Sequence, residues 1–264
     1  MIGGISRRLV LLGAASLAAC SAPPAGETIG SPPAGPPTGT SPWPGPGSQP
    51  NPSPARTASP AARPARPAVR HRSDWGADLP VKGHLQVEAP GEVKFLLVHH
   101  TESPCGTSVA AARDQLREAY RLHTSSKGWP DIAYNFLVDP GGRIWEGRSG
   151  SLVSPVMGSA TGGSQGHAIL CCFLGDFRGV APTSAAMSAM VALLAWQASV
   201  YRIDLWAGHT IKFVSRGSNR WPAGSAVVTD PIAGHREMSL TDCPGDALFP
   251  LIRRVLLPKA RALR

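Results

Sequence analysis

Two residues near the C-terminal end of the chain, His235 and Cys243, carry side chains that bind transition metals. They lie eight positions apart in the segment GHREMSLTDCPG (234–245), which has little helical pattern and ends in Pro-Gly after the cysteine. Neutral imidazole and thiolate are ligands that zinc prefers, but two ligands do not make a site. Our hypothesis is that His99, far upstream, is the third ligand. A fourth position would then stay open for water, as in a hydrolase.

The candidate third ligand belongs to a histidine pair, His99-His100, which ends the apolar run KFLLVHH (94–100). Such a run is typical of a strand buried on both faces. Adjacent strand residues point to opposite faces, so at most one of the two histidines serves a given site. A charged imidazolium would be costly there unless paired, and metal binding is one way to keep the ring neutral. A purely structural role explains the pair about as well.

The cysteines offer an alternative interpretation of Cys243. An exported protein with Cys105, Cys171, Cys172 and Cys243 could form two disulfides. However, Cys171 and Cys172 are adjacent in a predicted strand and face opposite ways, which makes it hard for both to find partners. A disulfide from Cys105 stays open, because connectivity cannot be read from the sequence.

Tyr134, early in a predicted strand of a hairpin, allows two interpretations. It either packs in the core with its hydroxyl satisfied at the edge, or donates its O–H to a developing oxyanion. Glu102 and Glu146 are candidate bases, although nothing raises either above a solvated or turn-stabilising carboxylate. Of the other histidines, His123 and His167 are interpreted as structural. His71, His84 and His209 are interpreted as surface residues.

The elements that must position these side chains are expected between Arg72 and about Leu257. Thr107 and Thr183 are predicted N-caps of the two long helices. The remaining pattern predicts strands over 94–100, 132–138, 143–146 and 168–174, helices over 108–123 and 184–201, and a last helix from Asp246 that is interrupted at Pro250 and ended by Pro258. Strands alternating with helices, plus one hairpin with the turn DPGG (139–142), predict an α/β fold with a mixed central sheet packed by helices.

The first 71 residues do not resemble a folded domain. Residues 1–20 have a basic start at Arg7-Arg8 and a short apolar run, which predict an export signal. Leu17-Ala18-Ala19-Cys20 resembles a bacterial lipobox, so we expect a lipid on Cys20 and a location at the outer face of the cytoplasmic membrane. The arginine pair fits twin-arginine export and an ordinary basic start about equally well.

Residues 21–71 are expected to form a disordered, Pro-rich linker that leads into a domain over 72–264. Fifteen of the 27 prolines lie between residues 21 and 70, with few large apolar residues to offset the entropy of ordering. The formal net charge of +9 suits an anionic envelope polymer or nucleic acid, and export argues against nucleic acid. We expect a monomer.

In their order along the chain, the motifs resemble the peptidoglycan recognition protein and type 2 N-acetylmuramoyl-L-alanine amidase family. The matching segments are RSDWGA (72–77), VHHT (98–101), GWPDIAYNFLVDPGGRIWEGR (128–148), FLGDF (173–177) and GHREMSLTDCPG (234–245). Each segment alone is a weak signal. Five of them in the family's order, covering essentially all of 72–257, are a strong one.

The resemblance implies a Zn²⁺ site formed by His99, His235 and Cys243, with Tyr134 as the catalytic tyrosine and Thr241 beside the metal. Two imidazoles and one thiolate leave one open position, the pattern of a catalytic site. The implied reaction is hydrolysis of the amide between N-acetylmuramic acid and the L-alanine of peptidoglycan stem peptides. Members that only bind peptidoglycan typically lack a ligand, so the complete set favours catalysis.

Two segments depart from the family pattern. The family usually carries a Gly-Ala-His-Ala segment and an Asn lining the peptide groove, whereas this chain has GSAT at 158–161 followed by Gly162, Gly163 and Ser164. The stretch 210–230 is also longer than usual and is a candidate lid or partner surface. The alternatives are a peptidoglycan-binding module without activity and an adhesin-like lipoprotein with a structural zinc site.

Overall fold

The structure is a computed structural model that describes residues 63–162 and 166–264. The predicted export signal, the lipobox with Cys20 and residues 21–62 of the predicted linker lie outside the described residues. Within them, no helix has the length and apolar character that a bilayer crossing requires.

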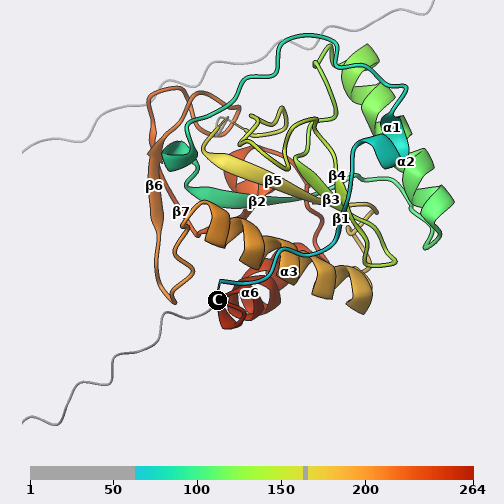
Figure 1. The fold of residues 1–264 in the computed structure, drawn as a ribbon. Coiled ribbons are helices and arrows are strands. Elements are labelled where there is room, and N and C mark those ends of the chain that lie inside the picture. Colours follow the sequence, from blue (N-terminus) through green and yellow to red (C-terminus); the bar gives the residue numbers. More distant parts are fainter. Residues whose placement is uncertain (1–62, 163–165) are drawn as a thin grey trace, which may run out of the picture. The chain divides into compact units, whose positions relative to one another are not determined.

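A mixed sheet of six strands forms the centre of the domain (Figure 1). The strand order is β1-β4-β3-β5-β2-β8, and β3 and β4 form its one antiparallel pair. The strands are β1 (Val69–Arg70), β2 (Phe95–His100), β3 (Phe136–Val138), β4 (Ile144–Glu146), β5 (Ala168–Phe173) and β8 (Ile232–Gly234). The sheet begins before residue 72, the expected start of the domain, because Val69 and Arg70 pair with Ile144 and Trp145.

Helices cover both faces of the sheet (Figure 1). One face packs against α2 (Val109–Arg121), which continues as a π-helical turn, η2 (Leu122–Ser126), and against the short α1 (Ser73–Gly76). The other face packs against α3 (Ser184–Val200) and the C-terminal helices α5 (Phe249–Leu251), η3 (Ile252–Leu256) and α6 (Leu257–Ala262). Two short segments, η1 (Pro90–Glu92) and α4 (His235–Met238), complete the helical elements. The predicted fold class, a mixed sheet packed by helices, is confirmed.

Strand β2 is buried on both faces, as its apolar sequence predicts. Leu96 and Val98 pack with α3, whereas Phe95 and Leu97 pack with α2. The alternation of side chains along a strand places His99 on the α2 side of the sheet and His100 on the α3 side. The two histidines therefore serve different environments, as expected.

Several predicted boundaries were wrong by one to a few residues. Ser108, not Thr107, caps α2 by accepting a hydrogen bond from Ala111 N–H at 3.0 Å, whereas Thr183 caps α3 as predicted. The hairpin strand predicted over 132–138 is regular only from residue 136.

The last helix does not end at Pro258, as the sequence had suggested, but continues to Ala262. The π-helical turn η3 precedes this proline, which then occupies the first turn of α6, where its missing N–H has little cost. Pro250 likewise lies in the first turn of α5 rather than interrupting a helix.

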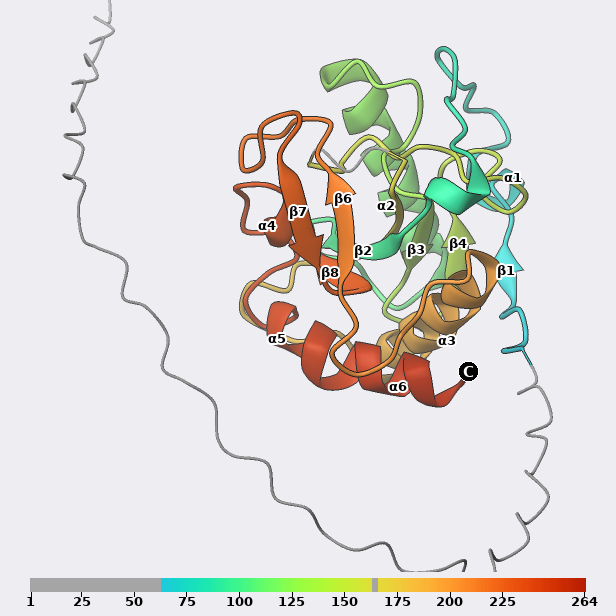
Figure 2. The ribbon, with the colours of Figure 1, turned by 90° about the vertical axis from the view of Figure 1, so that its left-hand side faces the viewer.

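The long stretch 210–230 folds into a second, two-stranded antiparallel sheet, β6 (Ile211–Val214) and β7 (Ala226–Thr229). Figure 2 shows this hairpin beside β8 and α4. Phe213 anchors it in the core by stacking on Phe95, with 5.3 Å between ring centroids, and Val227 is also buried. The hairpin thus packs against the core as an integral part of the domain.

Candidate metal centre and active site

Three side chains from two distant parts of the chain converge at the end of β2. His99, His235 and Cys243 each offer one ligand atom, and these atoms all lie within 4.8 Å of one another. Cys243 Sγ is 3.7 Å from His99 Nδ1, and the His99 and His235 ring centroids are 4.4 Å apart. The structure thus brings together the three residues that the sequence singled out as ligands.

Strand pairing and a tight loop create this convergence. Val98 pairs with Gly234 in the β2–β8 ladder, which places His99 next to His235, the first residue of α4. The loop then folds back, because Arg236 N–H donates to the carbonyl of Cys243 at 2.9 Å. The N–H of His100 reaches Cys243 Sγ at 3.5 Å. Backbone contacts therefore fix the cysteine against the end of β2.

Burial favours the uncharged forms of all three candidate ligands. It lowers the pKa of His99 well below its usual value, and it lowers the pKa of His235 to about 4, with neighbouring histidines adding to both shifts. Burial also raises the pKa of the Cys243 thiol to about 12, opposed by the His100 N–H. Neutral imidazoles are the form that binds a metal, and a nearby divalent cation is what would favour the thiolate.

The two ring nitrogens of His99 have different surroundings. Nδ1 faces Cys243 Sγ, whereas Nε2 is buried and has no hydrogen-bond partner among the described residues. Leaving a buried polar atom unpaired costs roughly 1–3 kcal/mol. The donor set and its spacing, with Nδ1 facing the sulfur, fit a zinc ion held by His99, His235 and Cys243.

Tyr134 lies against the cluster, with its ring centroid 5.1 Å from that of His99. It sits just before β3, not inside a strand as predicted, and its carbonyl accepts a hydrogen bond from Arg148 N–H at 2.8 Å. Burial raises the pKa of Tyr134 well above its usual value, and Cys172 and Cys243 add to the shift. The phenol therefore stays protonated and can act only as a neutral donor or acceptor.

Thr241 is half-buried and belongs to the same loop as Cys243. Its Oγ1 accepts a hydrogen bond from Cys243 N–H at 3.2 Å. Thr241 also lines a pocket of about 440 Å³ with Leu240, Arg220 and Arg236, and none of the three candidate ligands lines this pocket. Thr241 thus supports the backbone of Cys243 at the edge of the cluster.

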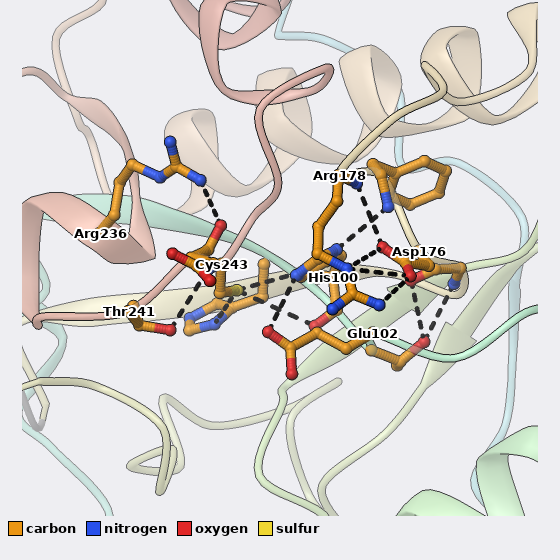
Figure 3. A network of polar contacts seen from close by, with 12 residues as sticks. His100, Glu102, Asp176, Arg178, Arg236, Thr241 and Cys243 are labelled. Carbon is orange, nitrogen blue, oxygen red and sulfur yellow. Dashed lines mark hydrogen bonds and ion pairs between the residues drawn. The ribbon is translucent and has the colours of Figure 1, made fainter.

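His100 and Glu102 form a polar network on the other side of the cysteine (Figure 3). His100 Nδ1 accepts from Phe177 N–H at 3.2 Å, and its Nε2 lies 3.4 Å from Glu102 Oε1. Glu102 has a φ of 58°, a left-handed backbone conformation that is uncommon for a residue with a side chain. Of the two candidate bases, Glu102 lies near the cluster. Glu146 is buried and accepts from Arg72 N–H and Leu152 N–H, which is a structural role.

Two neighbours of the site were not recognised in the sequence. His123, interpreted as structural, accepts from Ala133 N–H at 3.1 Å, and its ring packs edge-on to Tyr134 at 5.4 Å. Cys172 pairs in register with His99 and therefore faces the same side of the sheet. Only the alternation along β5 could have indicated Cys172, and no pattern indicates the π-helical turn that carries His123.

The disulfide alternative for Cys243 finds no support in the described part of the chain. Cys105, Cys171, Cys172 and Cys243 are all free thiols there. Cys171 packs in the core on the α3 side and Cys172 in the core on the α2 side, as their adjacency predicted. Of the other histidines, His167 is buried, whereas His71 and His84 are exposed.

The turn of the β6–β7 hairpin holds the loop that carries the site residues. Trp221 Nε1 donates to the carbonyl of Glu237 at 2.8 Å, and Ser218 Oγ donates to the carbonyl of Met238 at 2.8 Å. The Asn219 side chain accepts a hydrogen bond from Leu240 N–H and donates one to the carbonyl of Leu240. The stretch 210–230, a candidate lid or partner surface, thus also holds the segment between two candidate ligands in place.

Comparisons with known proteins agree with this arrangement. The family model Amidase_2, described as N-acetylmuramoyl-L-alanine amidase, matches residues 89–246. An N-acetylmuramoyl-L-alanine amidase of Mus musculus is 31% identical over 194 residues, which cover 71% of this chain and 30% of the mouse protein. The chain therefore spans less than a third of the length of that relative.

Peptidoglycan-recognition proteins are also similar. Peptidoglycan-recognition protein SC2 of Drosophila simulans is 28% identical over 183 residues, covering 69% of this chain and 83% of that protein. A crystal structure of peptidoglycan recognition protein-LE in complex with tracheal cytotoxin, a monomeric diaminopimelic acid-type peptidoglycan, superposes with a TM-score of 0.54. The two are 25% identical, and the match covers 71% of this chain and 93% of that one. With its sheet, its His-His-Cys cluster and a family match over most of the domain, this chain belongs to the N-acetylmuramoyl-L-alanine amidase (Amidase_2) family.

Proposed function

We propose that this protein is a zinc-dependent N-acetylmuramoyl-L-alanine amidase that hydrolyses the amide between N-acetylmuramic acid and the L-alanine of peptidoglycan stem peptides. The observation that carries the proposal is the convergence of His99, His235 and Cys243 beside the protonated phenol of Tyr134. Three ligands leave one position of a tetrahedral zinc site open, and an open position distinguishes catalytic from structural sites.

His99, His235 and Cys243 would hold the zinc ion, which when bound supplies a Lewis acid and lowers the pKa of a water molecule toward neutrality. Tyr134, whose phenol burial keeps protonated, donates a hydrogen bond to the amide oxygen as that oxygen gains negative charge. Thr241, whose Oγ1 accepts a hydrogen bond from Cys243 N–H, orients the water or the substrate beside the ligands. The N–H of His100 stabilises the cysteine sulfur as it becomes a thiolate.

The proposed substrate is peptidoglycan. Support comes from the family match and from the similar recognition protein whose structure contains a monomeric peptidoglycan fragment. We propose no role in nucleic-acid binding, although the chain has a formal net charge of +9. Such a charge equally suits anionic polymers of a cell envelope.

We further propose that the mature protein is a monomer, attached by a lipid on Cys20 at the outer face of the bacterial cytoplasmic membrane. The lipobox-like sequence before Cys20 supports the attachment. Mass spectrometry of the mature N-terminus tests it, because a start at any residue other than Cys20 contradicts the proposal.

A digest of purified sacculi with and without a zinc chelator tests the amidase activity. We expect free stem peptides with new alanine amino termini in the untreated digest, and no such peptides when the zinc is removed by the chelator. Similar proteins include peptidoglycan-recognition proteins, so a binding module without activity is the second candidate. Sacculus binding that persists with chelator, and no new amino termini in either sample, would establish that candidate.

A further inference from the structure

A second pocket lies away from the metal centre, and arginines dominate it. Its volume is about 490 Å³, and Arg63, Arg202, Arg261 and Arg264 line it together with Trp206. The pocket is built from the ends of α3 and α6 and from the first described residues of the chain. Both views show that the described chain starts beside its C-terminal end (Figures 1 and 2). The helices α3 and α6 cover the sheet face opposite to the one on which His99 lies.

The positive charge of this pocket is only partly compensated, by one carboxylate against four guanidinium groups. Among the residues that the structure describes, none of the four guanidinium groups lies within ion-pair distance of a carboxylate, whereas several arginines elsewhere do, as in Arg72–Asp131, Arg117–Asp78, Arg143–Asp139, Arg178–Asp176 and Arg253–Asp230. The one acidic side chain of the pocket, Asp204, accepts a hydrogen bond from Trp206 N–H. Four guanidinium groups and one carboxylate give the pocket a net positive charge, which favours an anion.

One further feature separates this pocket from an ordinary solvated surface. Trp206 leaves 72% of its surface exposed, more than any other large apolar aromatic side chain of the described residues. The left-handed conformation of Arg202, with a φ of 55°, belongs to the end of α3, where Ile203 N–H donates to the carbonyl of Ala198 at 2.8 Å. An alternative role for the arginines is to bind nearby backbone carbonyls, as Arg264 does by donating to the carbonyl of Ile203 in the loop after α3. That role does not account for Arg63 or for the exposed indole.

We propose that this pocket binds the phosphate groups of an anionic phosphodiester. Guanidinium groups match phosphate oxygens through paired N–H donors, and several in one pocket bind phosphate strongly without needing a buried site. An exposed tryptophan beside them suits the polar–apolar boundary of a lipid surface or the carbon face of a polymer's backbone. The shared chemistry is the phosphodiester, which can come from a phospholipid headgroup or from a soluble polymer of the envelope.

The test uses the full chain carrying Cys20→Ser, so that no lipid is attached. Its binding is measured to vesicles of phosphatidylcholine with and without phosphatidylglycerol, and to a soluble glycerol-phosphate polymer. The test variant is Arg202→Gln with Arg261→Gln. The matched control is Arg113→Gln with Arg121→Gln, two exposed arginines of α2 outside the pocket. Both double variants lower the net charge equally, so the comparison separates the pocket from the overall charge.

We expect salt-sensitive binding to at least one probe, weakened about tenfold or more in the pocket variant but not in the α2 control. Binding to phosphatidylglycerol vesicles alone identifies a lipid headgroup as the source, and binding to the polymer alone identifies a wall polymer. No binding to either probe, or equal loss in both double variants, overturns the proposal. The assay needs no hydrolysis, so its outcome is independent of the amidase activity.

Discussion

Asn219 makes two hydrogen bonds with the backbone of Leu240, accepting from its N–H at 2.8 Å and donating to its carbonyl at 3.3 Å. The amide thus pairs with Leu240 as a neighbouring strand would. Leu240 immediately precedes Thr241 and lies between His235 and Cys243 in the chain. A residue of the β6–β7 turn therefore holds the loop that connects the two candidate ligands.

Replacing Asn219 with Ala is expected to loosen this loop. Each lost hydrogen bond is worth about 1 kcal/mol, and small displacements of catalytic groups are costly, so we expect kcat to fall about tenfold. Zinc affinity, measured by competition with a chromophoric chelator, should fall in parallel. Lys212→Ala, which changes an exposed side chain of the same hairpin, is the control. Unchanged kcat and zinc affinity in Asn219→Ala would show that the turn does not position the site.

Tyr134→Phe removes the proposed oxyanion donor and keeps the aromatic ring. Because such donors act mainly on the transition state, we expect kcat to fall about 10²–10³-fold with little change in KM. Zinc content should stay at the wild-type level, since Tyr134 is not a ligand. Tyr120→Phe, whose hydroxyl donates to the carbonyl of Pro80 outside the centre, is the matched control. Wild-type kcat in Tyr134→Phe would exclude the donor role.

The buried imidazole of His123 makes the fold sensitive to acid. Burial, with Arg148 and Lys127 nearby, lowers the pKa of His123 from 6.5 to about 4. Between these values the unfolded chain binds a proton that the native state does not, so stability falls as pH decreases through this window. For one such group the loss between pH 8 and pH 5 is about 2 kcal/mol.

Urea unfolding at pH 8 and pH 5 measures this loss. His123→Asn keeps an acceptor for Ala133 N–H and removes the titrating group, so we expect a smaller difference in unfolding free energy between the two pH values. The buried His99 and His235 shift in the same direction and leave a residual dependence in the variant. An identical pH dependence in both proteins would contradict a neutral, buried His123.

The main elements of the fold are predictable because their sequences carry strong local signals. The apolar run before His99 identifies β2, and Thr183 followed by seventeen mostly apolar residues identifies α3. The continuation past Pro258 is not predictable in this way, because it depends on a π-helical turn that leaves no sequence pattern. The edge strand at Val69 was also missed, since a two-residue strand is defined by its partner β4.

In the candidate site, too, some features are predictable from the sequence and others depend on long-range contacts. His235 and Cys243 stand out because they share one loop, and the family's motif order indicated His99. Their actual proximity comes from the β2–β8 pairing, a long-range contact that spacing alone does not specify. The hydrogen bond from Trp221 Nε1 to the carbonyl of Glu237 is also a long-range contact that the sequence does not specify, because its donor and acceptor belong to elements with no shared sequence pattern. The zinc ligation itself stays a prediction.

The most direct test of the central claim compares the wild-type protein with Cys243→Ala on a muramyl peptide of known structure. Bound zinc and released peptide are measured on the same samples, by metal analysis and by mass spectrometry. We expect one zinc ion per wild-type chain and a freed peptide that begins with L-alanine, with both lost in the variant. Full release of that peptide by a Cys243→Ala protein that holds no zinc would contradict it.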